Sequence, residues 1–182
     1  MTGPHAPFLP QSQGWMFPEE LEFLYERASS GGYGGLLEIG CWKGLSTSAI
    51  AQGGYTVCID PFLPWGPSET GTFGEFIANM KEMHLLGRLT ILKGRSREIL
   101  PFLTPGYRLI LVDGCHDYED VLFDLLHSWA LLERGGVLAI DDYGISDWPG
   151  VKKAADEMMK VLENRYVLSD AGRGKLFYLV KA

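Results

Sequence analysis

The sequence lacks long apolar runs: no segment of its 182 residues approaches the roughly 20 consecutive apolar residues that cross a bilayer. The first ten residues contain three prolines and no basic region ahead of an apolar stretch, so they do not resemble a secretory signal. We therefore expect a cytoplasmic protein without a membrane partner.

Cysteine and basic residues are also scarce. The three cysteines, Cys41, Cys58 and Cys115, have neither the number nor the spacing of a disulfide set or a zinc site. The formal net charge is −7, and no basic run occurs along the chain. A surface for a phosphate backbone would therefore lack its electrostatic basis, and we expect no nucleic-acid partner.

What the sequence does contain is a regular alternation of short apolar runs and helix-period segments. With 46% hydrophobic and 21% charged residues, the chain has the composition of one globular domain over residues 1–182, with an N-terminal arm at 1–17 and a core at 18–182. Apolar runs predict strands at residues 36–40, 56–60, 89–93, 108–113 and 137–141. Residues 166–168 and 175–181 flank a turn-rich stretch and predict a closing antiparallel hairpin. We expect a Rossmann-like three-layer α/β sandwich with a mainly parallel sheet of about seven strands.

A glycine-rich turn follows the first predicted strand. Gly40 and Gly44 are spaced Gly-x-x-x-Gly, unlike the Gly-x-Gly-x-x-Gly of dinucleotide sites, although such turns also join strand to helix without a ligand. Glu38 precedes the turn, where a carboxylate suits an ammonium group. Asp60 ends the second strand, where it could accept hydrogen bonds from ribose hydroxyls or act as a turn residue before Pro61.

The pattern Glu-x-Gly-x-x-x-Gly, followed by an acidic strand end, resembles class I methyltransferases that bind S-adenosyl-L-methionine. The stretch Lys93-Gly94-Arg95-Ser96 is similar to the Gly-Asp-Ser that borders adenine in that class, with Arg95 in place of the acid. The resemblance implies that the cofactor-binding residues are Glu38, Gly40, Cys41, Trp42, Gly44, Ser46, Asp60, Arg95, Ser96 and Asp113.

Acidic residues also end the fourth and fifth predicted strands. Asp113 and His116 follow one strand, and Asp141 and Asp142 end the other. Neighbouring parallel strands end at the same edge of a sheet, so these groups should converge. Three carboxylates crowded together are costly without a cation, and oxygen ligands favour Mg²⁺ or a similar divalent ion.

This pair of motifs is similar to the macrocin O-methyltransferase and cephalosporin hydroxylase-like group. The resemblance implies that Asp113, Asp141 and Asp142 bind the metal and that His116 is the general base. Structural alternatives remain for each: Asp141 and Asp142 could begin a turn, Asp113 could cap a helix, and His116 could be a satisfied polar residue.

The function predicted from these motifs is a metal-dependent O-methyltransferase that uses S-adenosylmethionine and acts on a hydroxyl of a small molecule, such as a sugar or natural product. The alternatives are an NAD-dependent oxidoreductase, which the glycine spacing disfavours, and a non-catalytic module that binds S-adenosylmethionine. A homo-oligomer in which the N-terminal arm covers a neighbouring site is a further hypothesis.

Overall fold

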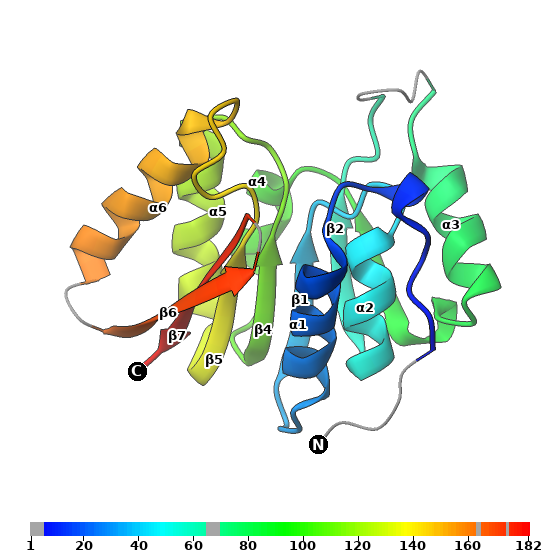
Figure 1. Ribbon diagram of the computed structural model, residues 1–182, viewed down its shortest axis with the longest axis horizontal. Helices are drawn as coiled ribbons and strands as arrows, with labels where there is room; N and C mark the ends of the chain where they lie inside the picture. Colours follow the sequence, from blue (N-terminus) through cyan, green and yellow to red (C-terminus); the bar gives the residue numbers. More distant parts are fainter. Residues whose placement is uncertain (1–5, 65–69, 163–164, 174) are drawn as a thin grey trace.

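A seven-stranded sheet forms the centre of the molecule, in the order β3-β2-β1-β4-β5-β7-β6 (Figure 1). The computed structural model describes residues 6–64, 70–162, 165–173 and 175–182. The first five strands are parallel, and β7 is antiparallel to both β5 and β6. The strands are β1 Gly35–Ile39, β2 Thr56–Asp60, β3 Leu89–Lys93, β4 Tyr107–Val112, β5 Leu132–Ile140, β6 Tyr166–Arg173 and β7 Leu176–Lys181. The predicted fold is confirmed.

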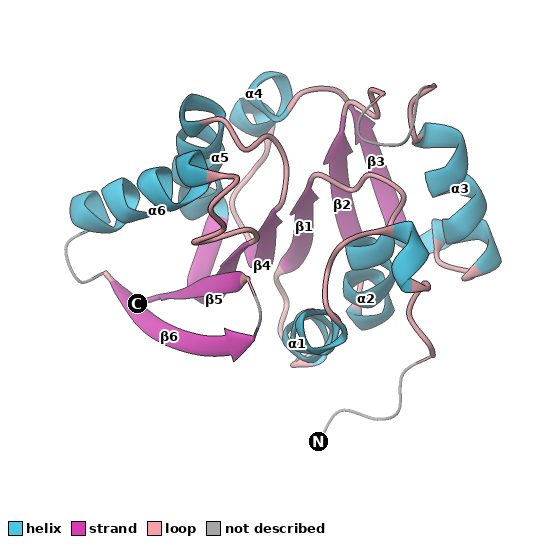
Figure 2. Cartoon of the chain, turned by 45° about the horizontal axis from the view of Figure 1, so that its top comes forward, coloured by secondary structure: helices cyan, strands magenta, loops and turns pink. Residues whose placement is uncertain are grey.

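Helices cover both faces of this sheet (Figure 2). They are α1 Pro18–Ser29, α2 Leu45–Gly53, α3 Phe73–Glu82, α4 Ser96–Ile99, α5 Tyr118–Leu131 and α6 Pro149–Leu162, with short 3-10 turns at Gln11–Gln13, Leu86–Arg88 and Leu100–Phe102. The first three helices lie on one face, and the last three lie on the other. This gives the three layers expected from the alternating sequence pattern.

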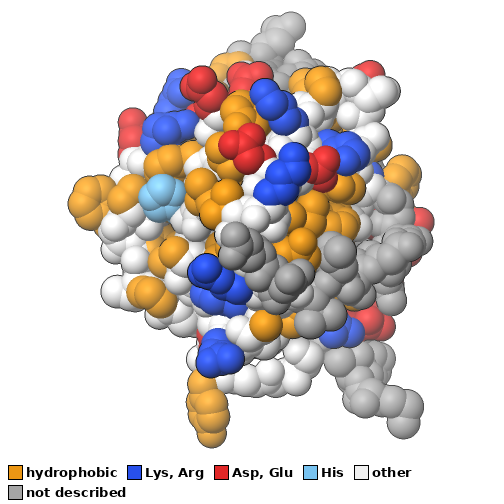
Figure 3. Space-filling model, turned by 90° about the vertical axis from the view of Figure 1, so that its left-hand side faces the viewer, with side chains coloured by type: hydrophobic (Ala, Val, Ile, Leu, Met, Phe, Trp, Pro, Cys, Tyr) orange, Lys and Arg blue, Asp and Glu red, His pale blue; other side chains and the backbone are white. Residues whose placement is uncertain are grey.

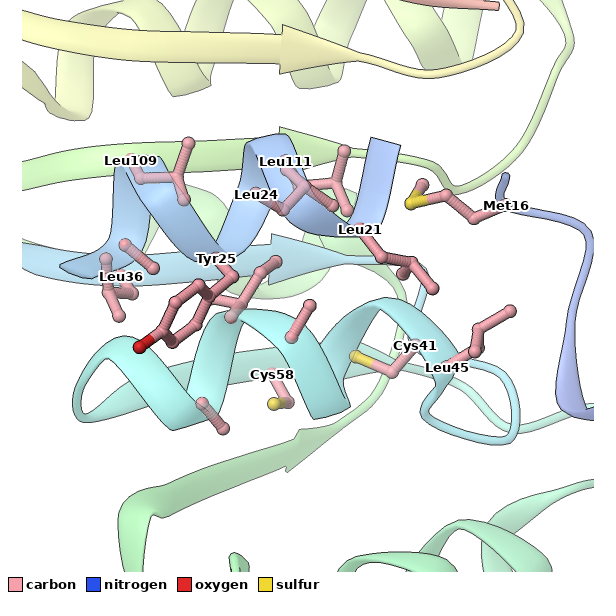
Figure 4. Packing of buried hydrophobic residues seen from close by; sticks show 14 of the residues in the cluster. Met16, Leu21, Leu24, Tyr25, Leu36, Cys41, Leu45, Cys58, Leu109 and Leu111 are labelled. Atoms are coloured by element: carbon pink, nitrogen blue, oxygen red, sulfur yellow. The ribbon is translucent and has the colours of Figure 1, made fainter. Parts of the chain in front are cut away.

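Alternate strand residues divide the core in two. Leu36 and Leu109 face α1 and α2, whereas their neighbours Leu37 and Ile110 face α5 and α6, and all four are fully buried. Figure 4 shows the first side, where α1 and α2 pack over β1 and β4. Burial of one such side chain contributes about 1.5–3 kcal/mol, so both faces stabilise the sheet.

Two predicted strand boundaries differ from the structure by more than one residue. β5 begins at Leu132, five residues before the predicted start at Val137, because its backbone continues through the polar Glu-Arg-Gly-Gly stretch with an irregularity opposite β4. β6 extends to Arg173, through the stretch predicted to be a turn. Neither extension could be predicted, because both stretches consist largely of glycine and charged residues and lack the apolar alternation that indicates a strand.

The strand order positions the chemistry. It reverses between β1 and β4, so the loops that leave these two strands diverge from a common point. β7 pairs with β5 in a register that places Ile140 opposite Phe177. Beyond this register, the N–H of Tyr143 donates to the carbonyl oxygen of Lys175 over 3.1 Å. The start of β7 is thereby brought to the carboxyl end of β5.

The described part of the N-terminal arm, residues 6–17, packs on its own chain. Leu9 and Met16 are buried in the core under α1 and α2, and the Trp15 ring lies against Trp42 with centroids 4.4 Å apart. The arm therefore covers the glycine turn of the same molecule. Whether the protein forms an oligomer stays a prediction.

Two surface features bear on possible partners. No helix among the described residues is long and apolar enough to cross a membrane. Figure 3 shows basic and acidic side chains intermixed on the face that carries α6, and Lys152 pairs with Asp156 there.

A hollow of about 510 Å³ is lined by α6 and the loop before it, and no predicted site residue lines it. All three cysteines are free thiols.

Candidate active site at the ends of β1, β4 and β5

The glycine turn after β1 is packed against the end of β4. Gly40 has a φ of 89°, and a Cβ added there would lie 1.8 Å from the carbonyl oxygen of Asp113. The Gly40 N–H donates to the carbonyl oxygen of Ile59 over 2.9 Å, and the Asp113 N–H donates to the carbonyl oxygen of Ile39 over 2.8 Å. Only glycine fits this left-handed position, because any side chain would displace the neighbouring strand end.

Gly44 has a packing role in the structure. It has a φ of 94° at the start of α2, and a Cβ there would lie 2.7 Å from the methyl group of Met80. Between the two glycines, Cys41 is buried and Trp42 has a left-handed φ of 43°. The indole N–H of Trp42 is buried and has no hydrogen-bond partner among the described residues. The turn therefore presents one unsatisfied donor.

Glu38 is enclosed by the start of α2. Its side chain is fully buried and accepts hydrogen bonds from Ser46 and, over 2.5 Å, from Thr47. Burial raises the pKa of Glu38 to about 7, although the two hydroxyls partly oppose this rise. Glu38 and Ser46 thus hold each other. The predicted contact of Glu38 with a cofactor ammonium and the predicted cofactor role of Ser46 stay predictions.

Asp60 ties β2 to the glycine turn. Its Oδ2 accepts the N–H groups of Cys41 at 2.7 Å and Trp42 at 2.8 Å, and its Oδ1 accepts the N–H of Phe62. These bonds fix the backbone of the turn, a role that sequence reasoning missed. The predicted contact with ribose hydroxyls would add to this role and remains untested.

Ser96, in the segment after β3, contacts a buried acid on α5 that the sequence did not indicate. Arg95 is exposed before α4, and Ser96 begins that helix. Asp124 on α5 is 1% exposed, and burial raises its pKa to about 6, with the Ser96 hydroxyl lowering it in part. One Asp124 oxygen has no partner among the described residues. The available signal was a carboxylate within the apolar stripe of α5.

The ends of β4 and β5 bring Asp113, His116 and Asp142 together. Each offers one potential ligand atom, and these atoms lie within 4.8 Å of one another. His116 Nε2 lies 2.9 Å from Asp142 Oδ2, and the His116 ring stacks on Trp148 with centroids 4.4 Å apart. The imidazole is therefore oriented on one edge by a carboxylate and on one face by an indole.

Lys175 completes this cluster from the start of β7. Its ammonium pairs with Asp141 Oδ2 and, at 2.6 Å, with Asp142 Oδ1. Burial alone would lower the pKa of Lys175, but the charges of Asp141 and Asp113 raise it. Burial opposes ionisation of Asp142, yet hydrogen bonds from His116 and Lys175 lower its pKa. Burial, and then the charge of Asp141, raise the pKa of Asp113.

The predicted metal ligands Asp113, Asp141 and Asp142 do not fit a divalent ion while Lys175 is in place. Both oxygens of Asp142 and one of Asp141 already bond to basic groups of the chain. A divalent cation would have to displace the ammonium or share its ligands with it, against Coulomb repulsion. The metal-binding role of these three residues is a prediction that the comparisons below do not test.

Comparison with known families identifies the chain. The family described as "Methyltransferase domain" matches residues 37–143, which is more than half of the sequence. The chain therefore belongs to this family, and the prediction of a methyltransferase is confirmed. The match disfavours the NAD-dependent oxidoreductase that the sequence left open. No curated protein matches the chain.

Solved structures of O-methyltransferases share the fold. One from Bacillus cereus, in complex with SAH, is 20% identical, with a TM-score of 0.68 over 91% of this chain and 82% of that one. TomG from Streptomyces achromogenes, involved in tomaymycin synthesis and in complex with SAM, is 19% identical, with a TM-score of 0.65 over 89% and 79%. A TDP-rhamnose 3'-O-methyltransferase of calicheamicin biosynthesis is 20% identical, with a TM-score of 0.63 over 88% and 76%. At these identities the likeness establishes the Rossmann-like fold.

The buried Glu38 makes a prediction about stability. Its pKa is about 7 in the folded chain against 4.5 for a free side chain, so the folded state binds its proton more tightly. This contribution to the free energy of unfolding, about 3 kcal/mol, is fully present below pH 4.5 and is lost as the pH rises towards 7. In thermal melts from pH 5 to 8, the Glu38→Gln variant should lose less stability than the wild type. An exposed control, Glu82→Gln, should follow the wild type, and parallel curves for Glu38→Gln would contradict the assignment.

Asp60 can be tested for both of its roles. The Asp60→Ala variant leaves three backbone N–H groups without their acceptor, so we expect at least about a tenfold loss of S-adenosylhomocysteine affinity in calorimetry. Repeating the titration with a 2'-deoxyribose analogue separates the roles. If Asp60 also binds the ribose, the wild type should discriminate between the two ligands and the variant should not. Unchanged affinity of Asp60→Ala for S-adenosylhomocysteine would contradict the role of Asp60 in fixing the glycine turn.

Proposed function

We propose that this methyltransferase uses S-adenosylmethionine to methylate a hydroxyl group of a small molecule, of the sugar or natural-product class. The observation that carries the proposal is the His116–Asp142 pair, which lies where β4 and β5 end, on the side of the sheet where the glycine turn leaves β1. An oriented imidazole is the group that an alcohol or phenol needs, because these hydroxyls are weak nucleophiles until a base takes their proton.

His116 would act through one ring nitrogen. When Nε2, which lies 2.9 Å from Asp142 Oδ2, carries the ring hydrogen, the lone pair of the neutral imidazole is on Nδ1. Nδ1 then takes the hydroxyl proton as the acceptor oxygen attacks. Asp142 stabilises the resulting imidazolium, and Trp148 keeps the ring from turning. Bound S-adenosylmethionine supplies a methyl group on a sulfonium, which leaves as the neutral thioether.

The cofactor would lie on the glycine turn at the point where the strand order reverses. The buried indole N–H of Trp42, which has no partner among the described residues, suits the carboxylate of a methionine group. We retain as proposed cofactor contacts the residues Glu38, Gly40, Cys41, Trp42, Gly44, Ser46, Asp60, Arg95, Ser96 and Asp113. Most of these residues lie in the glycine turn or at strand ends. Arg95, directly before α4, is the exposed residue of the set.

Calorimetry and a transfer assay test the proposal together. We expect S-adenosylmethionine and S-adenosylhomocysteine to bind with dissociation constants of order micromolar and NAD not to bind. Radiolabelled methyl transfer is then measured to panels of sugars, phenols and amines. Transfer to hydroxyl compounds is the expected result. Transfer to amines alone would contradict O-methylation, and cofactor binding without any transfer would favour the non-catalytic module.

A further inference from the structure

We propose that the ammonium group of Lys175 is the resident cation of this site and replaces the divalent metal, so that methyl transfer proceeds without one. This inference rests on the proposed function for its catalytic meaning. Which cation occupies the acidic cluster of Asp113, Asp141 and Asp142 does not depend on the identity of the methyl acceptor.

The ion pairs put Lys175 in the position of a shared cation. Its Nζ bonds to Asp141 and to Asp142, the adjacent acids at the end of β5. Asp142 uses its other oxygen for His116. A continuous chain of contacts therefore runs from Lys175 through Asp142 to the imidazole. The Lys175 side chain is 12% exposed, which distinguishes it from a mobile surface lysine.

The backbone of Lys175 is held on both sides. Its N–H donates to Glu20 Oε1 over 2.8 Å, and its carbonyl accepts the N–H of Tyr143 over 3.1 Å. Glu20 on α1 is fully buried, and it also accepts the N–H of Leu176 over 3.1 Å. The fold therefore places the ammonium at the acidic pair by fixing the start of β7. The contact does not depend on a long side chain finding its partner by chance.

The acidic pair at the end of β5 already has a cation. Asp141 and Asp142 are buried, and Lys175 contributes a positive charge to both of them from within the chain. A divalent ion at the same oxygens would leave the ammonium buried beside it and unpaired. Lys175 acts on the reaction by positioning Asp142, which in turn holds the His116 ring. It is therefore a positioning residue.

Metal binding gives a direct test. Mn²⁺ titrations followed by electron paramagnetic resonance, and Mg²⁺ titrations by calorimetry, are made on the wild type, Lys175→Met, Lys175→Arg and the surface control Lys152→Met. We expect no saturable site in the wild type, the arginine variant or the control. The methionine variant leaves Asp141 and Asp142 without their ammonium partner, beside Asp113, and should bind the metal at least about tenfold more tightly than the wild type. Wild-type binding as tight as that of Lys175→Met would overturn the proposal, as would no gain of binding in a folded Lys175→Met.

Activity gives a second readout once a hydroxyl acceptor is found. Wild-type turnover should be unchanged by EDTA, and Lys175→Met should lose about 100-fold in kcat while its S-adenosylmethionine affinity stays within about twofold. Lys175→Arg should recover part of the loss. Turnover that EDTA abolishes and Mg²⁺ restores in the wild type would overturn the proposal. If no hydroxyl compound is methylated, the proposed function fails while the metal titrations still decide the role of Lys175. If Lys175→Met does not fold, the wild-type titrations and EDTA result decide it.

Discussion

Replacing Gly40 with alanine should destabilise the protein by about 2–5 kcal/mol and abolish cofactor binding. The added methyl group would lie 1.8 Å from the carbonyl oxygen of Asp113 and would be forced on a residue with a φ of 89°. Relief of the clash must move either the glycine turn or the end of β4, which carries Asp113 into the acidic cluster. Chemical denaturation and calorimetry with S-adenosylhomocysteine measure the two effects.

Gly74 provides the matched control. It lies in the first turn of α3, and a Cβ there would meet nothing within 4 Å. The Gly74→Ala variant should be as stable as the wild type or more stable by about 0.5–1 kcal/mol, because alanine favours the helix. Similar denaturation midpoints for the two alanine variants would show that the close packing at Gly40 is not a constraint.

The His116→Ala variant should lose about 100- to 10,000-fold in kcat, which is the usual contribution of a general base. Its affinity for S-adenosylmethionine should stay within about twofold, because His116 pairs with Asp142 and stacks on Trp148 at the ends of β4 and β5. Single-turnover methyl transfer and calorimetry on the same preparation separate the two quantities.

His84 is a suitable control for that experiment. It is exposed, and its φ of 57° is tolerated by asparagine, so His84→Asn should retain wild-type kcat and cofactor affinity. Full activity in His116→Ala would remove His116 from the mechanism. Loss of cofactor affinity in proportion to the loss of turnover would place His116 in the cofactor site instead of at the acceptor.

Most of the fold could be predicted because its parallel strands are short apolar runs, covered by helices on both faces of the sheet. The apolar runs at 56–60 and 89–93 match β2 and β3 residue for residue. The acidic residues that end β4 and β5 could be placed at one edge of the sheet, since all parallel strands end there. The convergence of Asp113, His116 and Asp142 follows from that rule alone.

The position of Lys175 could not be predicted in this way. Its ion pairs join residues more than thirty positions apart in sequence. They exist because β7 lies between β5 and β6, in a register that no local pattern specifies. The same limit applies to Asp60, where spacing gave the location and only the structure gave the three N–H donors. Sequence patterns predict which groups share an edge, but not which of them satisfy one another.

The carboxylate of Glu20 has a mechanical consequence. One oxygen accepts the N–H of Phe17, where the arm enters α1, and the other accepts the N–H groups of Lys175 and Leu176. The entry of the arm and the start of β7 are thus two ends of a single linkage through a buried side chain. Because Trp15, two residues before Phe17, lies against Trp42, the arm beside the glycine turn and the start of β7 are anchored to the same buried carboxylate.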